Sequence, residues 1–218
     1  MMGCMIHVWP LPLAGEARAA ERHGIVVRSR AEVPLSRAPG DPVSIASLDV
    51  TAVLLEETGW VQEVVTAAIV AAMGIIAQCG VGASRFTLLG VAAPAPFRDL
   101  STPASRRLAS VLEPPRPTIY FVRDTRNQPA FDAEAFGTGN TRLTPELRHS
   151  VWVTRQAPDL PEAIAHELYH VLANSGGHSA DQDNLMHERT APGRRRLSAE
   201  QCATLRAEGR NSGLLTMP

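Results

Sequence analysis

The stretch AHELYHVLANSGGHSADQDNLMHE, residues 165–188, constrains this chain more than any other part of it. It begins with His166 and Glu167, and His170 completes the pattern His-Glu-x-x-His. Residues four apart lie on one face of an α-helix, one turn above the other, so the two histidines meet if the segment is helical. Apolar residues at helical spacing predict that helix without any use of the motif. The fold must therefore be built around a helix that presents two imidazoles to one point.

The ends of this helix are also predicted from the sequence. Asp159 is expected to cap its start, and Glu162 stands three residues later, as in a capping box. The helix should end near Asn174, because Gly176 and Gly177 offer the positive φ angles that a chain reversal needs.

Two imidazoles on one helical face are suited to bind a zinc ion. Glu167 lies one step round the helix, where it can accept a proton from a zinc-bound water rather than bind the metal. A catalytic zinc usually takes a third protein ligand. His178 is favoured, because it directly follows the turn that ends the helix, while Asp181, Asp183 and Glu188 remain alternatives.

This region resembles the metzincin clan of zinc metallopeptidases. Their signature is H-E-x-x-H-x-x-G-x-x-H, followed by a methionine in a tight turn beneath the zinc. The matching positions are His166, Glu167, His170 and His178, with Met186 as the turn methionine. The stretch HSADQDNLM also resembles the matrixin form of the signature.

The match departs from the signature at the exit of the helix. Ala173 stands where the family has a glycine, and the segment leading to His178 is two residues longer. The two changes fit each other if the helix continues for about half a turn and Gly176–Gly177 reverses the chain. His187 and Glu188 follow the methionine in place of the family's small or proline-containing pair.

The resemblance implies a zinc-dependent metalloendopeptidase that holds one catalytic zinc ion and uses Glu167 as general base. A peptide or protein substrate would lie extended along an edge strand, with residues 133–140 or the strand Val151–Thr154 as the rim of the site. The alternative is a catalytically inactive zinc-binding module on a metzincin-like scaffold. The intact Glu167 argues against that alternative, since a binding module needs no base.

The wider chain predicts an α/β (α+β) fold, and the resemblance implies a mixed, mainly parallel twisted sheet with a long backing helix, an active-site helix and a C-terminal helix. The predicted strands are 49–55, 86–91, 118–123 and 149–154. The other predicted helices are 57–79, 102–112 and 198–208, of which the last begins at a capping box and stops at Gly209.

The domain organisation follows from a change in composition. Residues 1–45 are rich in proline, glycine, alanine and arginine and predict a partly extended or disordered arm. Order is expected from about Ser47, so that residues 46–218 form the catalytic domain. The formal net charge of −1 gives no reason to expect nucleic acid as a partner. The most apolar run, Val64–Ala77, is too short to cross a membrane.

The three cysteines bear on where the protein acts. A peptidase of this kind is expected outside the cytoplasm (secreted, periplasmic or anchored to the envelope), where a Cys79–Cys202 disulfide would tie the last helix to the first. Two buried free thiols are the alternative. Cys4 is then left over, as a lipid anchor, as a thiolate that blocks the metal in a latent enzyme, or as an inert residue.

Overall fold

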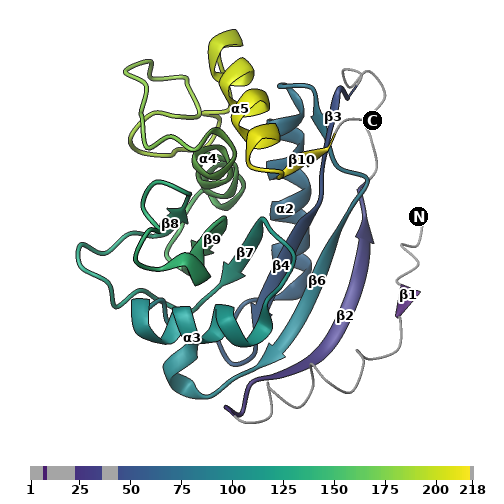
Figure 1. Ribbon diagram of the computed structural model, residues 1–218, viewed down its shortest axis with the longest axis vertical. Coiled ribbons are helices and arrows are strands. Elements are labelled where there is room, and N and C mark those ends of the chain that lie inside the picture. The colour runs from purple at the N-terminus through teal and green to yellow at the C-terminus, as the bar shows by residue number, and fades with distance from the viewer. Residues whose placement is uncertain (1–6, 9–22, 36–43, 217–218) are drawn as a thin grey trace.

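A computed structural model describes residues 7–8, 23–35 and 44–216, and a mixed sheet forms its centre (Figure 1). Within these residues the strand order of the main sheet is β1-β2-β6-β4-β7-β9-β8. The four strands β6, β4, β7 and β9 are parallel, while β1, β2 and β8 add antiparallel pairs at the two sides. The bounds are β1 His7–Val8, β2 Val26–Pro34, β4 Val50–Leu55, β6 Arg85–Ala92, β7 Thr118–Phe121, β8 Ala133–Phe136 and β9 Ser150–Val153. The predicted mixed, mainly parallel α/β fold is confirmed.

Helices cover both faces of the sheet (Figure 1). The helices α2 (Gln62–Ala77), α4 (Leu160–Ala173) and α5 (Ala199–Asn211) share one apolar core with alternate strand residues, such as Ala52 and Ile119. The helix α3 (Thr102–Leu112) packs on the other face, where Val53 and Tyr120 are buried. The central strands are therefore buried on both sides, which explains their nearly continuous apolar sequences.

A smaller sheet joins the end of the described chain to its earlier part. Its strand order is β10-β3-β5, from Leu215–Thr216, Ala46–Leu48 and Val81–Gly82. Two short 3-10 helices, η1 (Ala95–Phe97) and η2 (Pro145–Leu147), complete the connections on the α3 side.

Order begins earlier than the predicted start near Ser47. The strand β2 lies within the predicted arm and pairs with β6 from Val26↔Ala92 to Pro34↔Arg85. Its polar and apolar residues do not alternate cleanly, so this pairing could not be recognised from the segment alone. Cys4 lies outside the described residues, and its predicted roles stay predictions.

Two predicted helix boundaries are wrong for identifiable reasons. The helix α2 begins at Gln62 and not at Glu57, because Glu57 and Gly59 adopt positive φ angles of 59° and 82° in a preceding turn. The helix α5 continues past Gly209, where a Cβ atom would lie 2.7 Å from Leu215 Cδ1. The glycine therefore makes room for β10 instead of ending the helix. The predicted capping box at Ser198 is confirmed.

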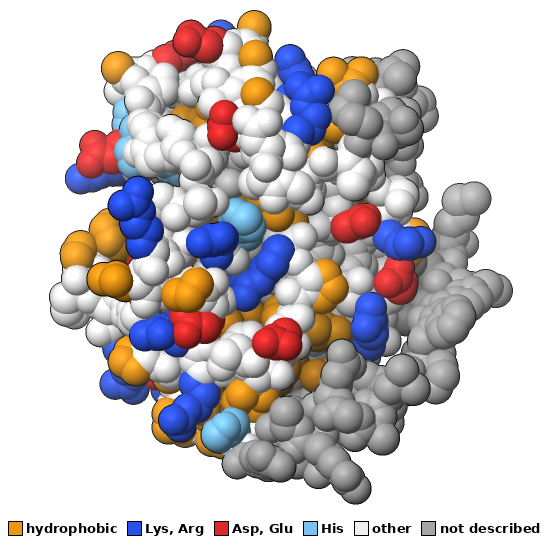
Figure 2. Space-filling model, in the orientation of Figure 1, with side chains coloured by type: hydrophobic (Ala, Val, Ile, Leu, Met, Phe, Trp, Pro, Cys, Tyr) orange, Lys and Arg blue, Asp and Glu red, His pale blue; other side chains and the backbone are white. Residues whose placement is uncertain are grey.

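Charged side chains of both signs occur on the face of the molecule shown in Figure 2. Arginine and acidic side chains are interspersed on the face shown in Figure 2, as expected for a formal net charge of −1. None of the helices in the described residues is long and apolar enough to cross a membrane.

Candidate metal centre

The helix α4 starts without the predicted cap. Asp159 is buried at the N-cap position, but its carboxyl oxygens have no hydrogen-bond partner among the described residues. Glu162 instead accepts hydrogen bonds from Arg195 Nε at 2.7 Å and from the Gly193 N–H at 3.1 Å. Burial alone would raise the pKa of Glu162, but these donors lower it overall. The carboxylate of Glu162 therefore anchors the loop before α5 to the start of α4.

The same helix ends through Asn174 and not through the glycine pair. Asn174 adopts the left-handed conformation, with φ of 47°, directly after the last helical residue, Ala173. Asparagine tolerates this conformation, and neither Gly176 nor Gly177 has a positive φ. The Asn174 side-chain oxygen also accepts a hydrogen bond from the Thr138 N–H at 3.2 Å. One residue thus reverses the chain and joins the helix to the segment after β8.

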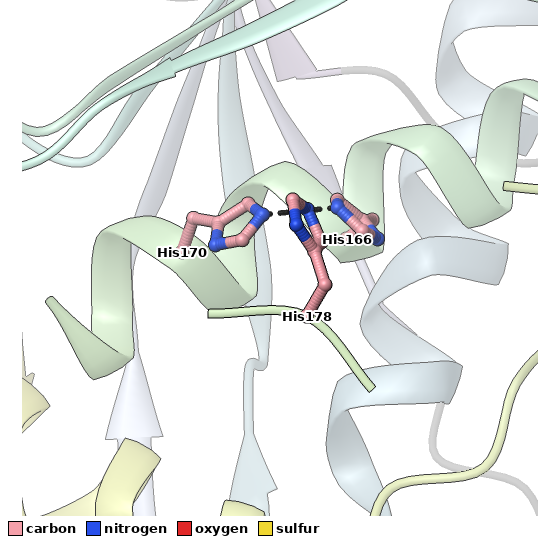
Figure 3. Close-up of side chains that lie close together, drawn as sticks. All are labelled: His166, His170 and His178. Atoms are coloured by element: carbon pink, nitrogen blue, oxygen red, sulfur yellow. Dashed lines mark hydrogen bonds between the residues drawn. The ribbon is translucent and has the colours of Figure 1, made fainter. Parts of the chain in front are cut away.

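Three histidines converge beside α4 (Figure 3). One ring nitrogen from each of His166, His170 and His178 lies within 4.8 Å of the other two. The Nε2 atoms of His166 and His170 are 2.9 Å apart. The ring centroid of His178 lies 5.3 Å from that of His166 and 5.1 Å from that of His170. The loop after α4 therefore brings the third predicted ligand to the first two.

The other ring nitrogens fix the tautomers of the helical histidines. His166 Nδ1 lies 2.8 Å from the Leu185 carbonyl oxygen, and His170 Nδ1 lies 2.5 Å from that of Ser175. A carbonyl oxygen only accepts, so each Nδ1 carries the hydrogen and each Nε2 keeps a lone pair. Burial lowers the pKa of His166 to about 4, although the hydrogen bond to Leu185 raises it. Burial also lowers the pKa of His170, so both rings are neutral near pH 7.

This arrangement fits a zinc ion. Two neutral imidazole nitrogens that point lone pairs at each other repel, whereas a cation between them attracts both. Nitrogen ligands at 2.0–2.1 Å from a tetrahedral zinc lie about 3.3 Å apart, close to the 2.9 Å between the two Nε2 atoms. Backbone carbonyls that accept the remote Nδ1–H are also typical partners of zinc-binding histidines.

The acidic alternatives to His178 lie outside the three-histidine group. The side-chain oxygen of Asp181 accepts a hydrogen bond from the Asp183 N–H at 3.0 Å, within an exposed turn. Glu188 lines the neighbouring cavity. The assignment of His178 as the third ligand stays a prediction.

The turn around Met186 positions two of the histidines through main-chain hydrogen bonds. Met186 is fully buried, and its carbonyl oxygen accepts a hydrogen bond from the Ser179 N–H at 2.6 Å, beside His178. The preceding residue, Leu185, supplies the carbonyl that orients His166. Two adjacent peptide units of this turn therefore position two of the three histidines.

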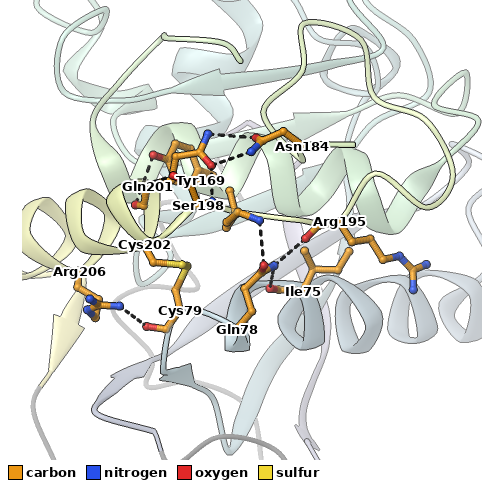
Figure 4. Close-up of a disulfide and its surroundings, with 11 residues drawn as sticks. Ile75, Gln78, Cys79, Tyr169, Asn184, Arg195, Ser198, Gln201, Cys202 and Arg206 are labelled. Atoms are coloured by element: carbon orange, nitrogen blue, oxygen red, sulfur yellow. Dashed lines mark hydrogen bonds between the residues drawn. A yellow bond between two sulfur atoms is a disulfide. The ribbon is translucent and has the colours of Figure 1, made fainter. Parts of the chain in front are cut away.

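A pair of side-chain amides fixes that turn (Figure 4). Asn184 Nδ2 donates to Gln201 Oε1 at 2.9 Å, and Gln201 Nε2 donates to Asn184 Oδ1 at 3.1 Å. Gln201 is also the third helical residue of the Ser198 capping box at the start of α5. The next residue, Cys202, is joined to Cys79 at the end of α2 by a disulfide. A continuous chain of contacts therefore runs from α2 through α5 to the turn beside the three histidines.

Glu167 faces a cavity of about 990 Å³ beside the histidines. Burial raises the pKa of Glu167 to about 8, and the charge of Glu134 acts in the same direction. A hydrogen bond with the main chain of Ala135 opposes the rise. The carboxyl group thus lies against β8, at the edge of the sheet and next to the three histidines.

The rim of this cavity comes from a segment for which no strand or helix was predicted from the sequence. The strand β8 and residues 137–140 line it, whereas β9 is enclosed between β7 and β8. Of the two segments predicted to form the rim, residues 133–140 therefore lie at the edge of the sheet. Glu134 lies within this predicted rim but was not singled out, and Asn174 was not predicted as a residue of the wall. The wall is assembled by strand pairing, and neither residue belongs to a recognisable motif.

Comparison with solved structures shows the fold class of the chain. The structure is similar to the crystal structure of metalloproteinase-II from Bacteroides fragilis, with a TM-score of 0.55 and 17% sequence identity. The match covers 81% of this chain and 57% of that chain, so this chain spans little more than half of the other's length. No protein-family model and no curated protein matches the sequence. Fold and site together define a metallopeptidase-like α/β fold with a three-histidine cluster.

Proposed function

We propose that this chain is a zinc-dependent metalloendopeptidase of the metzincin type. The observation that carries the proposal is the convergence of the His166 and His170 lone pairs, with His178 beside them and Glu167 in the adjoining cavity. The fold similarity to a metalloproteinase supports it independently of the motif.

The three histidines would hold the ion, and Met186 would serve as the buried turn methionine beneath them. A zinc ion held there supplies Lewis acidity, which polarises a substrate carbonyl and lowers the pKa of a water molecule. The charge of a bound cation would favour the ionised form of Glu167 over the form that burial favours. Glu167 would then accept the proton of the attacking water and deliver it to the departing amine. The open edge of β8 binds the substrate backbone as an added strand.

The test compares zinc-loaded wild-type protein with Glu167→Gln on a denatured protein substrate. The substitution keeps the size of the side chain but removes the base, so cleavage should fall by at least about 100-fold while zinc content is unchanged. Asp183→Asn is the matched control, since it removes one carboxylate outside the histidine group. Full cleavage by Glu167→Gln would refute the proposed mechanism. Stoichiometric zinc binding without cleavage by the wild type would support the alternative, a zinc-binding module.

We place this activity outside the cytoplasm. The disulfide between Cys79 and Cys202 supports that location, because such bonds persist in oxidising compartments. Thiol labelling of the protein taken directly from cell fractions tests the assignment. Unlabelled Cys79 and Cys202 in an extracytoplasmic fraction are expected, and labelled thiols in a cytoplasmic fraction would contradict it.

A further inference from the structure

One acidic residue of the cavity wall has no part in the proposed catalysis. Glu134 lies in the middle of β8, is half-buried, and lines the cavity together with Glu167. Its Oε2 atom accepts a hydrogen bond from Asn127 Nδ2 at 3.2 Å. Within the described part of the chain no arginine forms an ion pair with Glu134. A carboxylate that is partly removed from water and left without a cation is a site for a positively charged group.

The register of β8 and β9 determines which main-chain groups near Glu134 are free to pair with an added strand. The Thr154 N–H donates to the Asp132 carbonyl oxygen. The main-chain hydrogen bonds between β8 and β9 therefore involve every second residue of this segment, counted from Asp132. Ala133 and Ala135 therefore turn their main-chain groups to the open edge. The Ala135 carbonyl already accepts Asn140 Nδ2 at 3.1 Å, and its main chain also bonds Glu167. The main-chain groups of Ala133 are the ones that remain for an added strand.

An antiparallel strand that pairs with Ala133 places one of its residues directly opposite Glu134. On the open edge this is a non-hydrogen-bonded pair, in which facing residues have Cα atoms about 4.5 Å apart and side chains on the same face. The face is set by alternation along β8: Ala133 and Ala135 pack toward the core that includes α4, while Phe136 belongs to the opposite core. The Glu134 side chain therefore lies on the same face of the sheet as Phe136. The side chain of the substrate residue opposite Glu134 lies on this face too.

The surroundings favour a long cationic side chain at this position. Glu134 is half-buried beside the facing position, and within the described residues no arginine forms an ion pair with it. Phe131, farther along the same cavity lining, is 52% exposed. Because the cavity lining continues past Glu134 to Ala130, the chain of the substrate can extend beyond this residue. A side chain therefore suits the position better than the amino terminus of a peptide.

We propose that Glu134 determines specificity by pairing with a lysine or arginine side chain of the substrate, at the position opposite it on an added strand. The inference rests on the proposed peptidase function and gives that site its substrate class, which is a basic extended peptide segment.

The test maps the cleavage sites of zinc-loaded wild type and Glu134→Gln in a denatured protein digest by mass spectrometry. Wild type should prefer lysine or arginine at one fixed position relative to the cleaved bond. In Glu134→Gln, which keeps the shape and an acceptor for Asn127, kcat/KM for basic peptides should fall about tenfold relative to glutamine-containing ones. Glu134→Arg should shift the preference toward acidic residues at the same position.

Two controls separate this proposal from its alternatives. Glu188→Gln removes an equal charge elsewhere on the cavity lining, and it should leave the preference at that position intact. If Glu134→Gln and Glu188→Gln both lost the preference for lysine or arginine, that preference would arise from the overall negative potential of the cavity. This result would overturn the role of Glu134. Acetylated and free peptides distinguish a side chain from an amino terminus, and dependence of cleavage on the free amine would also overturn it. Wild-type cleavage that does not depend on Glu167 would remove the proposed function, and this specificity with it.

Discussion

The Nε2 atoms of His166 and His170 lie 2.9 Å apart, although each ring directs its Nδ1 to a main-chain carbonyl oxygen. Both Nε2 atoms are therefore acceptors, and they face each other without a hydrogen between them. The helix supplies the spacing, but the carbonyls of Leu185 and Ser175 set the direction of the rings. The three side chains are thus arranged so that they could hold a cation.

Zinc should therefore stabilise the folded protein. At a free zinc concentration about 1,000 times the Kd, binding adds about 4 kcal/mol to the free energy of unfolding. For a chain of this size that corresponds to a rise in Tm of roughly 10 °C, measured by thermal unfolding before and after treatment with a chelator. His166→Ala should abolish the response. An identical response in that variant would show that zinc binds elsewhere.

The amide pair of Asn184 and Gln201 should affect zinc affinity without touching the ion. Asn184 holds the Met186 N–H at 2.8 Å, and the neighbouring carbonyl of Leu185 orients His166. Asn184→Ala should weaken zinc binding by about 10-fold or more, as is usual for groups that orient ligands. The measurement is competition with a fluorescent chelator.

A double-mutant cycle provides the control for this pair. If the two amides act through each other, Gln201→Ala should add little to the effect of Asn184→Ala. Strictly additive losses of affinity would contradict a shared role in positioning the turn.

How far the sequence predicted this site depends on the range of the interactions. The helix carrying His166 and the capping box at Ser198 were predicted because neighbouring residues determine them. The end of α4 near Asn174 is confirmed, but the chain reversal was predicted at Gly176 and Gly177. Asn174 itself reverses the chain and contacts Thr138 from a distant segment. The contact between Asn174 and Thr138 cannot be predicted from the residues next to either of them in the sequence.

The missed elements of the fold share the same cause. The strand β8 is short, and its order comes from pairing with β9, so AEAF has no strong signal of its own. Gly209 lies within the helix, where a glycine is needed because Leu215 of β10 occupies the space that a side chain would fill. In both cases tertiary packing overrides the local preference.

Reduction of the Cys79–Cys202 disulfide should destabilise the protein by about 2–5 kcal/mol. The bond joins residues 123 positions apart and links α2 to α5, so it restricts a long loop in the unfolded chain. Urea unfolding with and without a reductant measures the difference. The double variant Cys79→Ser, Cys202→Ser should show no further effect of the reductant, and a stability equal to that of the oxidised wild type would contradict the prediction.

The acid stability of the α3 side should depend on Asp99. Its buried carboxylate accepts hydrogen bonds from Arg123 at 2.9 and 2.8 Å and from Arg126 at 2.8 Å. The hydrogen bonds from Arg123 are the largest cause that lowers the pKa of Asp99 below its ordinary value of 3.8, while burial opposes them. The stabilisation is therefore complete above that value, and it is lost as the pH falls through the lower pKa of the folded state.

Asp99→Asn tests this by urea unfolding between neutral pH and about pH 2. The variant should be less stable than the wild type by about 1–3 kcal/mol at pH 7, and the difference should shrink toward the acid end. A difference that stays constant across this range would assign the loss to packing and not to the charge.

The central claim is that three histidines of this chain hold one zinc ion beside Glu167. A crystal structure of the zinc-loaded protein, with anomalous diffraction at the zinc edge, tests it most directly. The account predicts a single zinc peak bound by His166 Nε2, His170 Nε2 and a ring nitrogen of His178, at about 2.0–2.1 Å. A peak bound by Asp181, Asp183 or Glu188 in place of His178, or the absence of zinc between the two helical histidines, would contradict it.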